Sequence, residues 1–365
     1  MKYLIYIGPG IGDWIIALPM ARRIKLNDPN AQITVLTCSN KKRFKLNKSL
    51  LTIQNWVDDV DYYSVREPIH DAYMLLKLGF NNYDYYFKSS YFDNSYISSW
   101  PNRIMRLAAK KGVGVRLNSR PDLVYDYSIS FKADNNVYET PLELLRTIGI
   151  YEHKNENITD LFDIEKVSME FDKLGISKEK KIITIVPGTA EAPVTADGKN
   201  GSKPAKNWPY EYWDELANKL EGDGYKVVVL GGAAEQHDII KNGYFSNPNV
   251  INICGKTNII ESCAVLRHSI LTIGGDTGMM HCSGAVGTPS LTLFGCTDYR
   301  NYLAYGEKSH FICSRRECSP CFGSDKLLTC NDFLCMKDIT VEEVYNKAIF
   351  IIEQQMKVKE ITDED

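Results

Sequence analysis

One stretch of the sequence, GGDTGMMHCSGAVGTPSLTLFG from Gly274 to Gly295, places four polar or glycine residues between an apolar run and a small-residue run. These residues are Asp276, Thr277, Gly278 and His281. A helix that begins near Gly278 offers unpaired backbone N–H groups and a positive dipole end, which together favour an anion. A satisfied core histidine is the simpler interpretation of His281 alone. Its combination with Asp276 is more specific than either residue alone, and the helix start beside them indicates an anion site.

A second stretch, GPGIGD at 8–13, carries Gly10 and Gly12 between an expected strand and helix. The dinucleotide fingerprint requires G-x-G-x-x-G and an acid about 20 residues later. The third glycine is misplaced here and that acid is missing, which argues against a nicotinamide site. The loop delivers Asp13 to the first turn of a helix. Spacing alone leaves two interpretations open: an acid favoured by the helix dipole, or a base for a nucleophilic hydroxyl.

A third candidate is Lys206 in AKNWP, just before a helix whose first residue we expect to be Pro209. It ends the long polar segment 189–207, and a loop of that length is usually functional or disordered. A lysine in this position is commonly solvent-facing. Its place at the end of a strand also suits a phosphate contact.

These residues depend on elements that alternate along the chain. We expect strands at 2–8, 33–37, 57–63 and 83–89, with helices at 13–25, 67–78, 100–111 and 139–149. The alternation restarts with strands at 182–188, 226–232, 270–275 and 289–295, and helices at 209–224, 258–269, 278–286 and 339–355. Thr340 is the expected N-cap of the last helix, with Glu343 at the capping-box position. Such βα repetition predicts α/β domains with parallel sheets, whose ligands bind at the carboxyl ends of the strands.

The domain boundaries follow from the same pattern. We expect one doubly wound domain at 1–160, a linker at 161–181 and a second doubly wound domain at 182–338. The second domain includes a four-cysteine segment at 313–338, and a helix and tail follow at 339–365. A chain of 365 residues is long enough for two such cores.

Composition and charge narrow the class of protein. The chain is 44% hydrophobic and 24% charged, as in water-soluble globular proteins. We expect a cytoplasmic protein, since no signal peptide or membrane span is recognisable. Residues 1–150 carry 20 Lys and Arg against 14 Asp and Glu, a net charge of +6, whereas the remainder is acidic. This asymmetry fits either a solvated face or contact with an anionic partner. We expect no nucleic-acid partner.

Four cysteines, Cys318, Cys321, Cys330 and Cys335, have the spacing C-x2-C-x8-C-x4-C. Four thiols in so short a segment indicate either a tetrahedral metal site or disulfides. A reducing cytoplasm favours the metal, and both zinc and iron suit four thiolates. The role would be structural, because the cysteines fill every position around the ion.

Together, GPGIGDWIIALP, the strand ending in PGT, K-x-W-P and GDTGMMHCSGAVGTPSLTLFGCT resemble glycosyltransferase family 9, the bacterial heptosyltransferases. The resemblance extends over most of the chain and departs from the family pattern mainly at 190–203, where the loop is longer. It implies a GT-B fold of two Rossmann-like domains facing a central cleft, with acceptor on the first and nucleotide-sugar donor on the second. It also implies inverting transfer of heptose from ADP-heptose without a catalytic metal.

By the resemblance, Asp13 matches the catalytic base, on a loop that includes Gly10 and Gly12. The residues that match donor contacts are Thr189 and Lys206 for phosphate, Glu235 for ribose, Thr257 near adenine, and Asp276, Thr277, Gly278 and His281 for the sugar and diphosphate. The longer loop leaves Lys199 and Lys203 as alternatives to Lys206.

Four functions follow as expectations. The first is transfer to a lipopolysaccharide inner-core acceptor at the inner face of the inner membrane, which a basic first domain would suit. The second is transfer to protein Ser/Thr, since protein-modifying heptosyltransferases carry an iron-binding four-cysteine finger. The others are a nucleotide-sugar epimerase and a non-catalytic nucleotide-sugar-binding protein. The pair Asp59 and Asp61 has the D-x-D form of metal-dependent glycosyltransferases, but fits a strand better.

Overall fold

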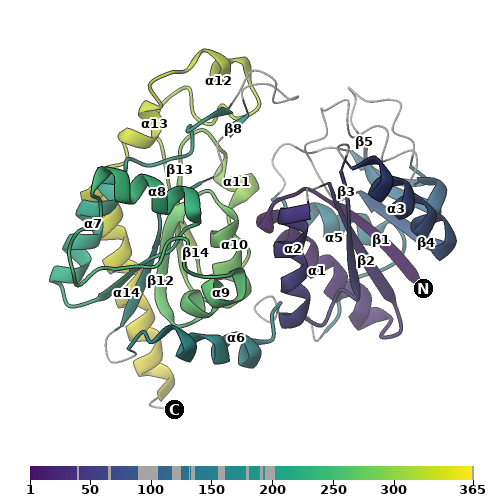
Figure 1. The fold of residues 1–365 in the computed structure, drawn as a ribbon, viewed down its shortest axis with the longest axis horizontal. Helices are drawn as coiled ribbons and strands as arrows, with labels where there is room; N and C mark the ends of the chain where they lie inside the picture. Colours follow the sequence, from purple (N-terminus) through teal and green to yellow (C-terminus); the bar gives the residue numbers. More distant parts are fainter. Residues whose placement is uncertain are drawn as a thin grey trace. The chain divides into compact units, whose positions relative to one another are not determined.

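The computed structural model describes residues 1–38, 41–64, 67–88, 106–116, 125–130, 132, 136–154, 161–177, 181–189, 192–193 and 202–363. The chain divides into two compact units, Met1–Asp163 and Ile164–Asp365. Each unit contains a six-stranded parallel sheet with helices around it (Figure 1). The expected pair of doubly wound α/β domains is therefore confirmed, and the division falls at the start of the expected linker.

The sheet of the first unit has the order β3-β2-β1-β4-β5-β6. Its strands are β1 (Lys2–Ile7), β2 (Gln32–Cys38), β3 (Asp59–Tyr63), β4 (Tyr83–Lys88), β5 (Ala109–Arg116) and β6 (Tyr127–Ser130). The helices are α1 (Ile11–Asn27), α2 (Lys41–Ser49), α3 (Pro68–Asn81) and α5 (Glu139–Arg146), with a 3-10 turn at Leu50–Ile53. The apolar run of β1 is buried from Tyr3 to Ile7, as in a strand with both faces covered.

The helix expected at 100–111 is wrong over its last residues. Residues 109–111 belong to strand β5, which pairs in parallel with β4, while residues 100–105 lie outside the described chain. Val113 and Val115 are buried in this strand, as suits β-branched side chains. A Cβ on Gly112 would lie 2.9 Å from the Cδ of Arg106. This close approach explains a glycine in a strand, which the sequence pattern hid.

The sheet of the second unit has the order β11-β10-β7-β12-β13-β14. Its strands are β7 (Ile182–Val186), β10 (Lys226–Val229), β11 (Ile251–Asn252), β12 (Ser269–Gly275), β13 (Ser290–Phe294) and β14 (Ser309–Cys313). A separate antiparallel pair joins β8 (Ala192–Pro193) to β9 (Ser202–Lys203). The helices are α6 (Ile164–Phe171), α7 (Tyr210–Gly222), α8 (Ala233–Asn242), α9 (Ile259–Arg267), α10 (Gly278–Ala285), α11 (Tyr299–Tyr302), α12 (Asp325–Thr329), α13 (Leu334–Lys337) and α14 (Val341–Asp363), with a 3-10 turn at Asp172–Leu174.

Helices α7 and α14 share the main core of this unit. Trp213 and Ile351 are buried in it, and Trp208 donates its Nε1 hydrogen to the Ile339 carbonyl at 2.8 Å. The Glu343 amide donates to Thr340 Oγ1 at 3.2 Å, which confirms the expected N-cap of α14. None of the helices in the described ranges is long and apolar enough to cross a bilayer.

In both sheets the chain first builds outward from a central strand and then returns to its other side. This reversal lies between β1 and β4 in the first unit and between β7 and β12 in the second. The loops that follow the two strands leave toward opposite faces of the sheet, and open α/β sheets bind ligands at such a point.

Candidate active site

The stretch after β12 lies at the reversal point of the second sheet. Asp276 follows the strand and is only 7% exposed. Thr277 occupies the N-cap position of α10 in extended conformation, and its side chain makes no capping hydrogen bond. The Thr277 hydroxyl therefore does not cap the first-turn N–H groups of α10. The hydroxyl and these N–H groups can both donate hydrogen bonds to an anion. The strand expected at 270–275 and the helix expected at 278–286 are confirmed.

Lys206 is held beside this joint by charge and by aromatic rings. Its Nζ lies 2.8 Å from Asp276 Oδ2, and the two side chains are 17% and 7% exposed. The same Nζ lies 4.9 Å from the ring centre of Phe322 and 5.7 Å from that of Tyr302. The lysine is thus a positioned cation at the end of the strand, with apolar rings limiting its contact with water.

Thr189 reaches the same point from the end of β7. Its hydroxyl is hydrogen-bonded to Asn207 Oδ1. A Cβ on Gly275 would lie 2.5 Å from Thr189 Cγ2 and 3.3 Å from the Lys206 carbonyl oxygen. Glycine at 275 is what lets the segments carrying Thr189 and Lys206 pack onto the end of β12. We call Thr189, Lys206, Asp276, Thr277 and His281 the strand-end cluster.

His281 is the buried member of this cluster, with 6% of its surface exposed. Burial lowers its pKa to about 4; the charge of Asp276 opposes that shift and Lys206 adds to it. The imidazole is therefore neutral at pH 7 and contributes hydrogen bonding instead of charge. The only full positive charge that the cluster presents to a phosphate is that of Lys206.

Glu235 lies at the same edge of the sheet, after β10. Its Oε2 accepts a hydrogen bond from the Gly232 amide at 2.7 Å at the start of α8. A Cβ on Gly188, which follows β7, would collide with the Glu235 carboxyl group. Thr257 precedes α9, and its hydroxyl lies 2.9 Å from that of Ser262. The structure thus places both residues at strand or helix ends, with Glu235 against the loop that leads to Thr189.

In the first unit, Asp13 stands at the start of α1 as Glu235 stands at the start of α8. It is the third residue of α1, and its Oδ2 accepts a hydrogen bond from the Gly10 amide at 2.8 Å. A Cβ on Gly8 would lie 2.5 Å from that oxygen. Gly12 lies within the first helical turn. Asp13 therefore caps the first turn of α1. The same hydrogen bond fixes its carboxylate at the reversal point of the first sheet.

Sequence reasoning missed two buried polar residues at strand ends. Lys88 closes β4, pairs in register with Tyr6 of β1 and is 3% exposed. Thr297 follows β13, is 3% exposed, and its Oγ1 lacks a hydrogen-bond partner within the described part of the chain. The available signal was a polar residue at the end of a largely apolar strand or just after it, as in YDYYFK and LTLFGCT.

The four cysteines line one cavity of about 140 Å³. Burial, together with the three other thiols, raises the pKa of the Cys335 thiol to about 11. Even so, no three His, Cys, Asp or Glu side chains of the described residues are grouped closely enough to hold a metal ion. The donor chemistry fits a metal, whereas the spacing in this structure is too open for coordination.

The cysteine segment is attached to the strand-end cluster. The amides of Cys321 and Phe322 both donate to the Cys296 carbonyl, at 2.8 Å each, just beyond β13. Ala205, next to Lys206, packs in the same small core as Cys296 and Leu327. The segment therefore holds the Phe322 ring that contacts Lys206.

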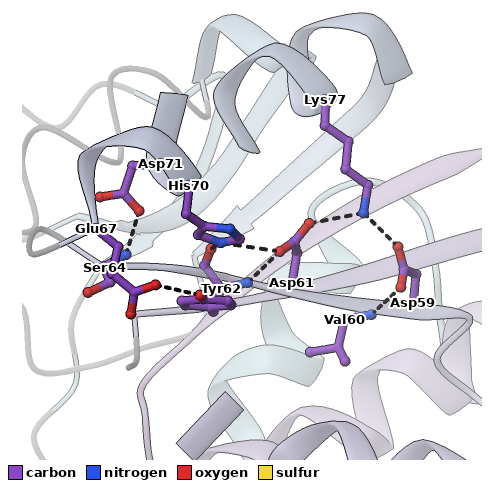
Figure 2. Close-up of polar contacts among 9 residues, drawn as sticks. All are labelled: Asp59, Val60, Asp61, Tyr62, Ser64, Glu67, His70, Asp71 and Lys77. Atoms are coloured by element: carbon purple, nitrogen blue, oxygen red, sulfur yellow. Dashed lines mark hydrogen bonds and ion pairs between the residues drawn. The ribbon is translucent and has the colours of Figure 1, made fainter. Parts of the chain in front are cut away.

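The D-x-D pair is part of strand β3, as expected. Lys77 of α3 bridges both carboxylates, with its Nζ 3.1 Å from Asp59 Oδ2 and 2.9 Å from Asp61 Oδ2 (Figure 2). Burial disfavours the ammonium ion, but these hydrogen bonds outweigh burial and raise the pKa of Lys77 above its usual value. A lysine charge thus occupies the place between the carboxylates that a divalent cation would need.

Comparison with known proteins identifies the family of the chain. The model of glycosyltransferase family 9 (heptosyltransferase) matches residues 77–331. Lipopolysaccharide heptosyltransferase 3 of Escherichia coli is 23% identical over 79% of this chain and 80% of its own length. Lipooligosaccharide heptosyltransferase 2 of Haemophilus influenzae is 28% identical, but the match spans only 30% of this chain and 33% of that protein.

Solved structures extend the likeness to the whole fold. E. coli ADP-heptose lps heptosyltransferase II has a TM-score of 0.68 at 20% identity, over 98% of this chain and 100% of that one. The iron-containing dodecameric glycosyltransferase TibC of enterotoxigenic E. coli has a TM-score of 0.53 at 12% identity, over 97% and 76% of the chains. The two units have the GT-B fold of these enzymes, and because the family model matches most of the chain, the chain belongs to glycosyltransferase family 9, the heptosyltransferases.

Proposed function

We propose that this chain transfers heptose from ADP-heptose, or a closely related nucleotide-sugar, to a hydroxyl of a lipopolysaccharide inner-core acceptor, with inversion at the anomeric carbon. One observation carries the proposal: Lys206, Asp276 and the uncapped start of α10 meet at the reversal point of the second sheet. A fixed cation and free N–H groups at that point suit a diphosphate.

Asp13 is the proposed general base. It takes the proton of the acceptor hydroxyl while the oxygen bonds to the anomeric carbon and the bond from that carbon to the ADP oxygen breaks. ADP leaves with the electron pair of the broken bond.

The strand-end cluster is proposed to hold the donor and stabilise its leaving group. Negative charge grows on the diphosphate as the bond breaks, and preorganised donors stabilise that charge. Lys206, the Thr277 hydroxyl and the Gly278 amide are the proposed donors, while Asp276 and neutral His281 orient the sugar. Glu235 is proposed to bind the ribose, with Thr257 near the adenine.

The acceptor class rests on charge. The first 150 residues, with a net charge of +6, suit the phosphates and acidic sugars of an inner core at the cytoplasmic face of the inner membrane. A protein Ser/Thr hydroxyl is the second candidate acceptor. The four cysteines that line one cavity favour it, because protein-modifying heptosyltransferases carry a four-cysteine finger.

The first test is nucleotide release. Purified protein is incubated with ADP-heptose, UDP-sugars and GDP-sugars, each with and without a core acceptor or a Ser/Thr-containing protein acceptor. We expect ADP release with ADP-heptose that depends on the core acceptor. The absence of ADP release above background with any acceptor would refute transfer, and dependence on the protein acceptor alone would select the second candidate.

We also propose that the four cysteines hold one structural zinc or iron ion once they close around it. The ion would supply a rigid cross-link between the two halves of the segment and no step of the transfer. Elemental analysis is expected to find about one ion per chain. Cys330→Ser should lose it and raise the KM for the donor about tenfold, because the segment holds Phe322 against Lys206.

The matched control for that variant is Cys313→Ser, which changes a partly buried thiol at the end of β14 outside the cavity. It should keep both the ion and the donor KM. Absence of zinc and iron from the wild-type protein, or a Cys313→Ser variant that loses metal as Cys330→Ser does, would disprove the site.

A further inference from the structure

Two aromatic rings from different segments of the second unit pack against the ammonium group of Lys206. Tyr302 belongs to the short helix α11 after β13, and Phe322 belongs to the cysteine segment after β14. Lys206 Nζ lies over both rings, 5.7 Å from the centre of Tyr302 and 4.9 Å from that of Phe322, which is the range of a cation–π contact. The two rings meet edge to face, with their centres 6.3 Å apart. We call Tyr302 and Phe322 the aromatic clamp.

Backbone hydrogen bonds fix both rings to the same strand end. The Phe322 amide donates to the Cys296 carbonyl at 2.8 Å, and the Tyr302 amide donates to the Asp298 carbonyl at 3.1 Å. The Asp298 side chain caps α11 by accepting the Arg300 amide at 2.9 Å. Cys296 and Asp298 both lie just beyond the end of β13, the strand next to β12. The chain therefore brings the rings to Lys206 through two separate anchors at one edge of the sheet.

The chemistry of the rings suits a lysine that must keep its charge. Asp276 Oδ2 already lies 2.8 Å from Lys206 Nζ, and a second carboxylate would neutralise the ammonium group. An aromatic face attracts a cation through its quadrupole but carries no net charge. The clamp also restricts a long and flexible side chain before any ligand arrives, so less rotamer entropy is lost when a phosphate binds. The rings thus order Lys206 and leave its charge for an anion.

We propose that Tyr302 and Phe322 are positioning residues for the donor, which hold Lys206 ordered and thereby tighten the binding of a nucleoside diphosphate. The inference rests on the proposed function, since ADP-heptose is the proposed donor, and it makes the cysteine segment a wall of the donor site. The competing explanation is that the rings only exclude water from the loops around Lys206. Any apolar side chain would then serve as well as an aromatic one, whereas positioning through the ring face requires the aromatic quadrupole.

The test replaces Phe322 in the full chain by phenylalanines with one, two and three ring fluorines. Fluorine withdraws electron density from the ring face and changes the size of the ring little, so the cation–π contact weakens stepwise. Titration calorimetry with ADP is expected to show a Kd that rises with each fluorine, to about fivefold at three. Phe322→Leu, which is apolar but lacks the ring face, should weaken ADP binding about fivefold as well. Tyr302→Phe should bind ADP more tightly than Tyr302→Leu.

The controls separate positioning from folding. Adenosine has no phosphate, so its Kd should stay constant across the fluorinated series, as should the Tm. Phe350→Leu is the matched variant, because Phe350 makes the same kind of contact with Lys347, at 5.3 Å on the surface of α14, and it should bind ADP as the wild type does.

A flat ADP response to fluorination, or Phe322→Leu with wild-type affinity for ADP, would overturn the aromatic clamp and leave the proposed donor in place. Adenosine binding that weakens in step with ADP would also overturn it, because the rings would then support the folded loops and not the phosphate contact. A wild-type protein that does not bind ADP would refute the proposed donor and the clamp together. A graded ADP response without any transfer would refute the proposed function and leave the clamp standing.

Discussion

Replacing Asp13 by Asn is expected to lower kcat about 1,000-fold, because the variant keeps the shape of the carboxylate but cannot take the proton of the acceptor hydroxyl. The amide oxygen of Asn can still accept the Gly10 N–H that Asp13 Oδ2 accepts at 2.8 Å. The start of α1 should therefore survive, with a Tm within a few degrees of wild type and an unchanged KM for the donor. Steady-state kinetics measure kcat and KM, and thermal unfolding of the same samples measures Tm.

The chain supplies a matched comparison for this variant. Glu235 caps α8 as Asp13 caps α1, and its Oε2 accepts the Gly232 amide at 2.7 Å. Glu235→Gln should raise the donor KM through the ribose and leave kcat nearly unchanged. Gly8→Ala should lower kcat by displacing the Asp13 carboxylate, which a Cβ would approach to 2.5 Å. If Asp13→Asn lost less than about threefold in kcat, Asp13 would be only a first-turn acid.

Much of the fold followed from the sequence because buried parallel strands are continuous apolar runs. The strands from β1 to β4 stand close to where the apolar runs predicted them, as do β7, β10, β12 and β13 of the second unit, whereas β11 and β14 were not expected. The failures have physical causes. Helix α2 contains only Phe44 and Leu46 as apolar residues and so lacks a helical pattern, and the glycines and lysines of β5 concealed a strand.

The sequence predicted where the site residues lie along the fold, but not which side chains contact one another. Asp276 and Thr189 were expected at strand ends because the order of elements fixes where strands end. The ion pair between Lys206 and Asp276 spans 70 residues, and Phe322 reaches Lys206 from a segment that had suggested only a metal site or disulfides. Such contacts depend on how loops fold over the edge of a sheet, and no local pattern encodes them.

Lys206→Met is expected to lower kcat/KM for the donor about 100-fold, because it removes the full positive charge that the strand-end cluster presents to the diphosphate. It should also destabilise the second unit by about 3 kcal/mol, since it leaves the Asp276 carboxylate buried without its cation. These two effects separate in a double-mutant cycle. Lys206→Met/Asp276→Asn removes both charges and should recover most of the free energy of unfolding, measured in urea.

Activity should not follow stability in that cycle. A purely structural ion pair would let the double variant regain transfer together with stability, whereas a lysine that binds the diphosphate leaves the double variant as inactive as Lys206→Met. Lys199→Met and Lys203→Met are the controls, because the family resemblance leaves both lysines as alternatives to Lys206 for the same phosphate. Loss of donor binding in either control, with normal kinetics in Lys206→Met, would move the phosphate contact to that loop. Near wild-type kinetics in both would leave the contact with the lysine that Asp276, Tyr302 and Phe322 hold in place.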